Sequence, residues 1–115
     1  MHELGVAFHV VKAVEEVAEE NNVTQVNSVT IELGEVSTVI PDQLQDVWRW
    51  AADNRSQHMH GAELKIEIIP AVTFCEDCEQ EYGTVEHGRI CPYCGSENTY
   101  LLQGNEFTIK EIEAM

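Results

Sequence analysis

Residues 75–94 read CEDCEQEYGTVEHGRICPYC and form the most informative segment of this chain. The segment contains two CxxC pairs, Cys75 with Cys78 and Cys91 with Cys94, separated by twelve residues. Two residues between cysteines let one tight turn present both thiolates to one ion, and two such turns complete a tetrahedral shell. The spacing therefore predicts a closed four-cysteine site that holds Zn(2+) in a structural role.

Three other interpretations of the cysteines stay open: a pair of CxxC disulfides, a redox-active dithiol, or unliganded thiols. A redox motif normally occurs once within a βαβ unit, whereas here two copies flank a polar loop. A closed shell of four sulfurs leaves no position for water or substrate, so a zinc ion there would stabilise the module rather than catalyse hydrolysis.

Periodic patterns on both sides of the cysteines predict the remaining elements. Apolar residues recur every three or four positions from Leu4 to Glu20 and again after Pro41, which indicates two amphipathic helices. Alternating apolar and polar residues predict strands at about 28–33, 63–69 and 107–112, and the first of these is expected to bury only one face.

The expected fold is therefore α+β: a small mixed three-stranded sheet with two helices and an inserted four-cysteine zinc-ribbon-like module. Its 115 residues leave no room for a separate catalytic domain. We expect residues 1–73 together with 99–115 to form an α/β domain and residues 74–98 to form the zinc-binding module.

Charge and hydropathy exclude several partners. The chain has 6 Lys+Arg against 21 Asp+Glu, a formal net charge of -15, which repels nucleic-acid backbones and anionic membranes. Its apolar runs are far shorter than the roughly 20 residues that cross a bilayer. We expect no nucleic-acid partner, no membrane insertion and, without a signal-peptide pattern, a cytoplasmic protein with reduced cysteines.

The opening Met1-His2-Glu3 suggests a second metal site. A free terminal amine, the next peptide nitrogen and the His2 imidazole can bind one ion through short chelate rings, and nickel and copper favour such nitrogen sites. The first amides of a helix lack intrahelical acceptors, so deprotonating one would cost the helix little. From these residues alone, a chelate and an exposed surface histidine both stay open.

The other histidines have no partner that the sequence identifies. His9, on the first predicted helix, is interpreted as a packing or surface residue. His58 and His60 flank Met59 in a polar connection, and His87 lies in the loop between the CxxC pairs. Each of these three is a weaker candidate for a further nickel ligand.

Four segments, in this order, resemble the HypA/HybF family of hydrogenase maturation proteins. They are residues 1–4 (MHEL), residues 31–36 (IELGEV), the two CxxC pairs and residues 109–112 (IKEI). The resemblance covers nearly the whole chain, and it is specific because the order and spacing of all four segments match.

The resemblance implies a nickel metallochaperone rather than an enzyme. Such a protein binds Ni(2+) as transient cargo and delivers it to the large-subunit precursor of [NiFe]-hydrogenase, together with a HypB-type GTPase. In some bacteria, relatives also serve urease and its maturation proteins. The family's nickel site maps onto Met1, His2 and Glu3, and its zinc site onto the four cysteines.

Other classes of function fit only parts of the sequence. Zinc ribbons often bind nucleic acid or act as protein-interaction modules, but residues 74–98 contain a single basic residue, Arg89, among several carboxylates. No Ser/His/Asp pattern, phosphate-binding glycine loop or open zinc triad indicates an enzyme. The nickel affinity, the complete nickel ligand set, the receiving enzyme and the oligomeric state stay open.

Overall fold

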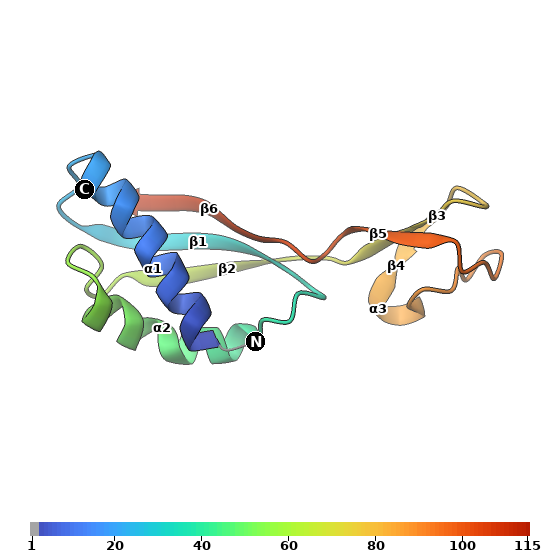
Figure 1. Cartoon of the computed structure of the whole chain (residues 1–115), viewed down its shortest axis with the longest axis horizontal. Helices are drawn as coiled ribbons and strands as arrows, with labels where there is room; N and C mark the ends of the chain where they lie inside the picture. Colours follow the sequence, from blue (N-terminus) through green and yellow to red (C-terminus); the bar gives the residue numbers. More distant parts are fainter. Residues whose placement is uncertain (1–2) are drawn as a thin grey trace. The chain divides into compact units, whose positions relative to one another are not determined.

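The computed structural model describes residues 3–115, which form two compact units (Figure 1). The first unit contains the residues up to Ile31 together with Thr38–Glu67 and Thr108–Met115. The second contains Glu32–Ser37 and Ile68–Phe107. None of the helices within residues 3–115 is long and apolar enough to cross a membrane.

A three-stranded sheet with the order β2-β1-β6 is built from β1 (Val26–Gly34), β2 (Glu63–Ile69) and β6 (Phe107–Ala114). Just beyond the end of β1, Glu35 N donates to Ile69 O at the end of β2, so these strands run in the same direction. Gly34 N, at the end of β1, donates to Glu106 O just before β6, so β6 runs the opposite way. The sheet is mixed, as predicted.

Both predicted helices are present and pack against each other: α1 (Glu3–Glu20) and α2 (Pro41–Arg55). Pro41 begins α2, a position where its missing N–H and restricted φ suit the helix. The apolar stripe predicted for α1 consists of Leu4, Ala7, Val11, Val14 and Ala18, and all of these except the exposed Leu4 are buried. The helices contribute to the core Ala7, Val10, Val11, Val14, Ala18, Leu44, Trp48, Ala51 and Ala52.

Strand β1 is buried on both faces, which corrects the expectation of a single buried face. Ser28 and Thr30, on the polar face, are 4% and 5% exposed. Because β1 is the central strand, long side chains from both neighbours reach across it, and the aliphatic parts of lysines can cover such a surface. Two ion pairs join β2 to β6: Lys65 with Glu113 at 3.1 Å and Lys110 with Glu67 at 2.9 Å.

The second unit contains elements that the sequence patterns did not predict. A second sheet has the order β4-β3-β5, formed by β3 (Val72–Cys75), β4 (Glu81–Gly83) and β5 (Thr99–Gln103). The strands β4 and β5 both pair antiparallel with β3, and a single helical turn, α3 (Thr84–His87), follows β4. This sheet fixes the ends of the two cysteine-bearing turns.

The segment that follows β1 is hydrogen-bonded to the residues before and after the cysteine region, at Ile69, Ala71 and Gly104. Glu35 N donates to Ile69 O, and Val36 N donates to Gly104 O, each at 2.8 Å. The Glu35 carboxylate also accepts the backbone N–H of Ala71 at 2.9 Å. All three bonds lie within the second unit, so residues 32–37 help to hold together the chain segments on either side of the cysteine region.

Candidate metal centre

The structure brings all four predicted cysteines into one cluster. Cys75 ends β3, Cys78 lies in the turn after it, and Cys91 and Cys94 lie in the turn before β5. The four sulfurs all lie within 4.8 Å of one another, and two cross-turn distances, Cys75 to Cys94 and Cys78 to Cys91, are 3.6 Å. The cluster could therefore hold one metal ion.

The two CxxC turns share one backbone design. Glu79 N donates to Cys75 O at 2.9 Å, and Gly95 N donates to Cys91 O at 2.8 Å. The residue after each pair has a positive φ, 58° at Glu79 and 74° at Gly95. Glycine adopts this left-handed region without strain, as at Gly95, whereas Glu79 has a conformation that non-glycine residues seldom adopt.

The spacing of the sulfurs fits a tetrahedral four-thiolate ion and does not fit disulfides. Zinc–sulfur bonds of about 2.3 Å place sulfurs about 3.8 Å apart in a tetrahedron, close to the observed 3.6 Å. A disulfide needs a bond of about 2.05 Å, and all four cysteines are free. Four thiolates form a soft donor set of the kind that zinc binds.

The local environment makes the thiols unequal. Burial raises the pKa of Cys78 to about 12. Burial opposes ionisation of Cys91 as well, but the backbone N–H groups of Tyr93 and Cys94 donate toward its sulfur and lower its pKa to about 7. Because metal ligands must be thiolates, a bound dication has to compensate the cost of ionising the thiols whose pKa is raised, such as Cys78.

Neighbouring residues join the two turns to each other. The Asp77 carboxylate accepts hydrogen bonds from Ser96 Oγ and from Asn98 Nδ2, and these two bonds lower the pKa of Asp77. Tyr82, buried beside Cys75 and Cys91, donates its hydroxyl to Gly88 O at 2.9 Å. The Asp77 bonds link the two turns in addition to any ion that the sulfurs hold, and the sequence spacing did not reveal these contacts.

The predicted N-terminal site falls only partly within the described residues. Met1 and His2 lie outside them, so their assignment stays a prediction. Glu3 is the first residue of α1, and it lines a shallow pocket together with Gln43 and Asp46 of α2. The helix therefore begins within one residue of the position that its apolar pattern indicated.

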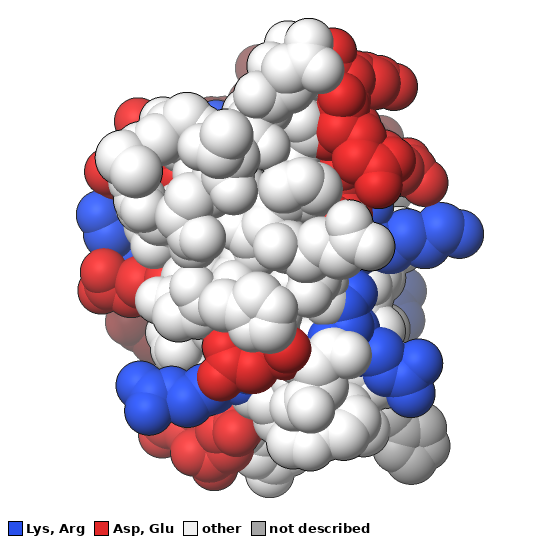
Figure 2. Space-filling view, turned by 90° about the vertical axis from the view of Figure 1, so that its left-hand side faces the viewer, with Lys and Arg blue, Asp and Glu red and all other residues white. Residues whose placement is uncertain are grey.

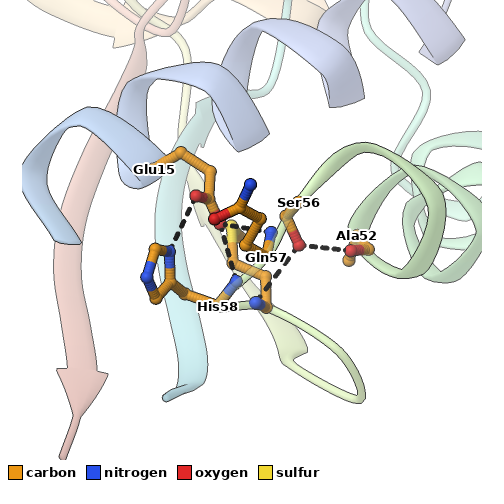
Figure 3. Close-up of polar contacts among 6 residues, drawn as sticks. Glu15, Ala52, Ser56, Gln57 and His58 are labelled. Carbon is orange, nitrogen blue, oxygen red and sulfur yellow. Dashed lines mark hydrogen bonds and ion pairs between the residues drawn. The ribbon is translucent and has the colours of Figure 1, made fainter. Parts of the chain in front are cut away.

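His58 has a partner that sequence reasoning missed. Its Nδ1 lies 2.8 Å from Glu15 Oε2 on α1 (Figure 3). The other Glu15 oxygen accepts the backbone N–H groups of His58 at 3.0 Å and Gln57 at 3.2 Å. Burial would raise the pKa of Glu15, but the bonds from His58 outweigh it and lower that pKa. The pair anchors the connection after α2 to α1.

The other histidines do not gather into a second metal site. His9 and His60 are exposed, as interpreted for His9. His87 meets the ring of Tyr82 edge-on, with 5.9 Å between ring centroids. Within residues 3–115, the four cysteines are the only group of three or more His, Cys, Asp or Glu side chains arranged to hold an ion.

Comparison with known proteins gives concordant similarities over the whole chain. A family model described as "Hydrogenase/urease nickel incorporation, metallochaperone, hypA" matches residues 1–114. The chain is 31% identical over 113 residues to the hydrogenase maturation factor HybF of Klebsiella pneumoniae, covering 98% of each. It is 38% identical over 118 residues to the hydrogenase maturation factor HypA of Methanococcus maripaludis, covering 95% of this chain and 91% of that protein.

A solved structure shares the fold. The solution structure of the Ni metallochaperone HypA from Helicobacter pylori superposes with a TM-score of 0.72 at 25% identity, covering 100% of this chain and 98% of that one. The similarity in structure therefore extends over both compact units and includes the cysteine region.

Proposed function

Because the chain belongs to the HypA family of nickel metallochaperones in hydrogenase maturation, we propose that it carries Ni(2+) to the large-subunit precursor of [NiFe]-hydrogenase. The observation that carries the proposal is the family match over residues 1–114, because it includes both the N-terminal segment and the cysteine cluster. On this proposal the protein is a carrier and catalyses no reaction of its own.

The proposed nickel site consists of the Met1 amine, His2 and Glu3. The amide of Glu3 belongs to the first turn of α1, whose N–H groups have no intrahelical acceptor, so nickel can displace its proton without breaking a helix bond. Amine, amide and imidazole nitrogens together supply the tetragonal geometry that Ni(2+) favours. Because the nickel is cargo, this site has to release it again.

The proposed resident metal is Zn(2+), held by Cys75, Cys78, Cys91 and Cys94. The ion would supply charge compensation for four thiolates and fix the two turns in place. On this view residues 74–98 form the zinc-binding module, and residues 1–73 with 99–115 form the domain that carries nickel. Support comes from the sulfur spacing and from the number of cysteines, since four thiolates complete a tetrahedral shell.

The proposed partners are a HypB-type GTPase, the hydrogenase precursor and, where urease is present, urease maturation proteins. Support for this set comes from the relatives, which are hydrogenase maturation factors, and from the family description, which includes urease. We propose the cytoplasm as the site of action, since four free cysteines next to one another stay reduced there.

Metal analysis with matched variants tests the nickel site. We expect about one tightly held zinc and one exchangeable nickel per chain. In calorimetric titration, His2→Ala and an added N-terminal tag should each abolish specific nickel binding, because each removes a ring or amine nitrogen of the chelate. Zinc content should not change.

His9→Ala is the matched control, since it removes an exposed imidazole from α1 and should leave nickel affinity unchanged. Equal nickel affinity in the native, tagged and His2→Ala proteins would exclude the N-terminal site and transfer attention to His60 or His87.

A further inference from the structure

An open groove of about 650 Å³ runs between α1 and the C-terminal end of α2. Phe8, Val11 and Lys12 line it from α1, and Asn54 and Arg55 line it from α2. Glu15 and Gln57 also line the groove, and the Glu15 carboxylate accepts the backbone N–H groups of Gln57 and His58 (Figure 3). The nickel and cysteine sites use none of these residues.

Arg55 lies over two aromatic rings, Phe8 in the groove lining and its neighbour Trp50. Its Cζ lies 4.7 Å from the centroid of the Phe8 ring and 5.9 Å from that of the Trp50 ring, and the two rings are 5.8 Å apart. The side chain has no hydrogen bond or ion pair with another of residues 3–115. A guanidinium stacked on aromatic faces keeps its in-plane N–H donors available for a carboxylate, which it can bind in bidentate geometry.

Trp50 is 50% exposed, an unusual position for the largest apolar side chain. Together with the half-buried Phe8 it leaves an aromatic surface next to the free guanidinium. Exposed aromatic and arginine side chains in contact with each other are the composition that recurs where proteins bind one another.

Charge changes sign along the groove wall that α1 forms. Phe8, Lys12 and Glu16 follow at four-residue steps, so they lie on one face about 6 Å apart, and Glu19 comes one turn later. Lys12 forms no ion pair within residues 3–115, whereas Lys65 is paired with Glu113. The wall therefore presents an apolar, then a positive, then a negative surface.

We propose that this groove docks a partner protein through a segment whose contact face presents an apolar side chain, a carboxylate and a basic side chain, in that order. The apolar group packs on Phe8 and Trp50. The carboxylate binds Arg55 beside Lys12, and the basic group pairs with Glu16 and Glu19. A polyphosphate fits less well, because both glutamates and a net charge of -15 repel it. A second copy of the chain is disfavoured by the same charge.

The test uses the full chain and a synthetic helical peptide of about 15 residues with Leu, Glu and Lys at four-residue steps, the spacing that places them on one face. Calorimetry should detect binding of this peptide and much weaker binding of a peptide with the same composition in scrambled order. Arg55→Glu should weaken binding about tenfold or more. A peptide with Glu replaced by Arg should bind Arg55→Glu better than it binds the native chain.

Matched variants separate docking from folding. Arg49→Glu makes the same charge change on α2 outside the groove lining and should leave peptide affinity unchanged. Lys12→Glu, on the other helix, should weaken binding as Arg55→Glu does. The charge-reversed peptide shows that a weakened variant still folds, because only a folded groove can recover binding.

Three results would overturn the proposal. The first is equal affinity of the native chain for the ordered and scrambled peptides, including no binding to either. The second is that the native chain self-associates in sedimentation experiments and that Arg55→Glu abolishes this self-association, which would assign the groove to a second copy of the chain. The third is inorganic tripolyphosphate displacing the peptide and binding more tightly, which makes the site an anion pocket. The purified GTPase is titrated separately, so its failure to bind affects the proposed function and leaves this result standing.

Discussion

Gly34 is a glycine because another segment of backbone occupies the space that a side chain would need. A Cβ atom at this position would overlap the carbonyl group of Gly104. The next residue, Glu35, holds Ala71 through its carboxylate. Residues 31–36, which carry part of the family resemblance, thus have a structural role: they contact the backbone on both sides of the cysteine region.

Gly34→Ala should lower the free energy of unfolding by about 3 kcal/mol, because the added methyl meets backbone rather than a side chain that can turn away. Chemical denaturation measures this. Gly5→Ala is the control: nothing lies within 4 Å of the new methyl on α1, so it should be neutral or add up to about 1 kcal/mol. Similar losses for both variants would contradict the crowding at Gly34.

The Glu15 contact predicts a pH-dependent stability. Hydrogen bonds from His58 outweigh burial and lower the pKa of Glu15 from 4.5, so the ionised carboxylate stabilises the folded state above the unfolded pKa. That contribution is lost as the pH falls through the lowered pKa. Glu15→Gln should therefore cost about 1 kcal/mol at pH 7, the usual scale for a hydrogen bond, and the difference should vanish in acid.

Denaturation of both proteins between pH 7 and 3, each freed of metal beforehand so that acid does not change the metal content, tests this prediction. Glu16→Gln changes the neighbouring exposed carboxylate, whose side chain has no bond to the Gln57–His58 segment, and should show no such trend. A loss for Glu15→Gln that is independent of pH would show that the loop depends on packing and not on the charge.

At the level of elements, the sequence predicted the long ones and missed the short ones. The helices α1 and α2 and the strands β1, β2 and β6 repeat their pattern over 7 to 18 residues, long enough to reveal a period. The elements β3, β4, β5 and α3 span only three to five residues each, and a pattern that short cannot be told from a loop.

In the candidate metal centre, the sequence predicted the ligands but not the contacts around them. The CxxC spacing is local, so it identified the four cysteines. The hydrogen bonds from Ser96 and Asn98 to Asp77 join residues 19 and 21 positions apart, and Glu15 contacts His58 over 43 positions. Such contacts depend on how the elements pack, which no spacing rule contains.

The short elements should depend on the metal. The buried cluster in the cysteine region consists of Cys75, Tyr82 and Cys91, so two of its three members are proposed ligands. Removing the ion should place repelling or protonated sulfurs in that core, and hydrogen exchange should then lose protection across residues 74–98 while α1 keeps it. Cys78→Ser should reproduce the loss.

Adding zinc back is the control for that experiment, because it should restore protection in the native chain and restore less in Cys78→Ser. Unchanged protection throughout residues 74–98 after complete removal of metal would mean that the Asp77 bonds and the β4-β3-β5 sheet suffice.

Over the whole molecule, charge limits which partners can approach. Acidic side chains gather in clusters on the face shown in Figure 2, and basic side chains lie scattered between them. Among the basic residues, Lys65 and Lys110 pair with glutamates, which removes two positive charges from those available to an anionic partner. The surface therefore favours cations and basic protein surfaces.

This balance gives the last prediction, that the chain does not bind DNA or RNA at physiological ionic strength. A zinc ribbon that binds nucleic acid needs basic side chains to neutralise phosphates, and residues 74–98 offer only Arg89 against a net charge of -15. Fluorescence anisotropy with labelled duplex DNA, single-stranded DNA and RNA should show no binding at low micromolar protein, with a basic DNA-binding protein as the positive control. Glu97→Lys, which replaces a negative charge with a positive one, should not create binding, because the remaining field stays strongly negative. Submicromolar binding that weakens steeply as the salt concentration rises would contradict this prediction, because such a salt dependence arises from neutralised phosphates. That result would favour a nucleic-acid-binding zinc ribbon over a metal carrier.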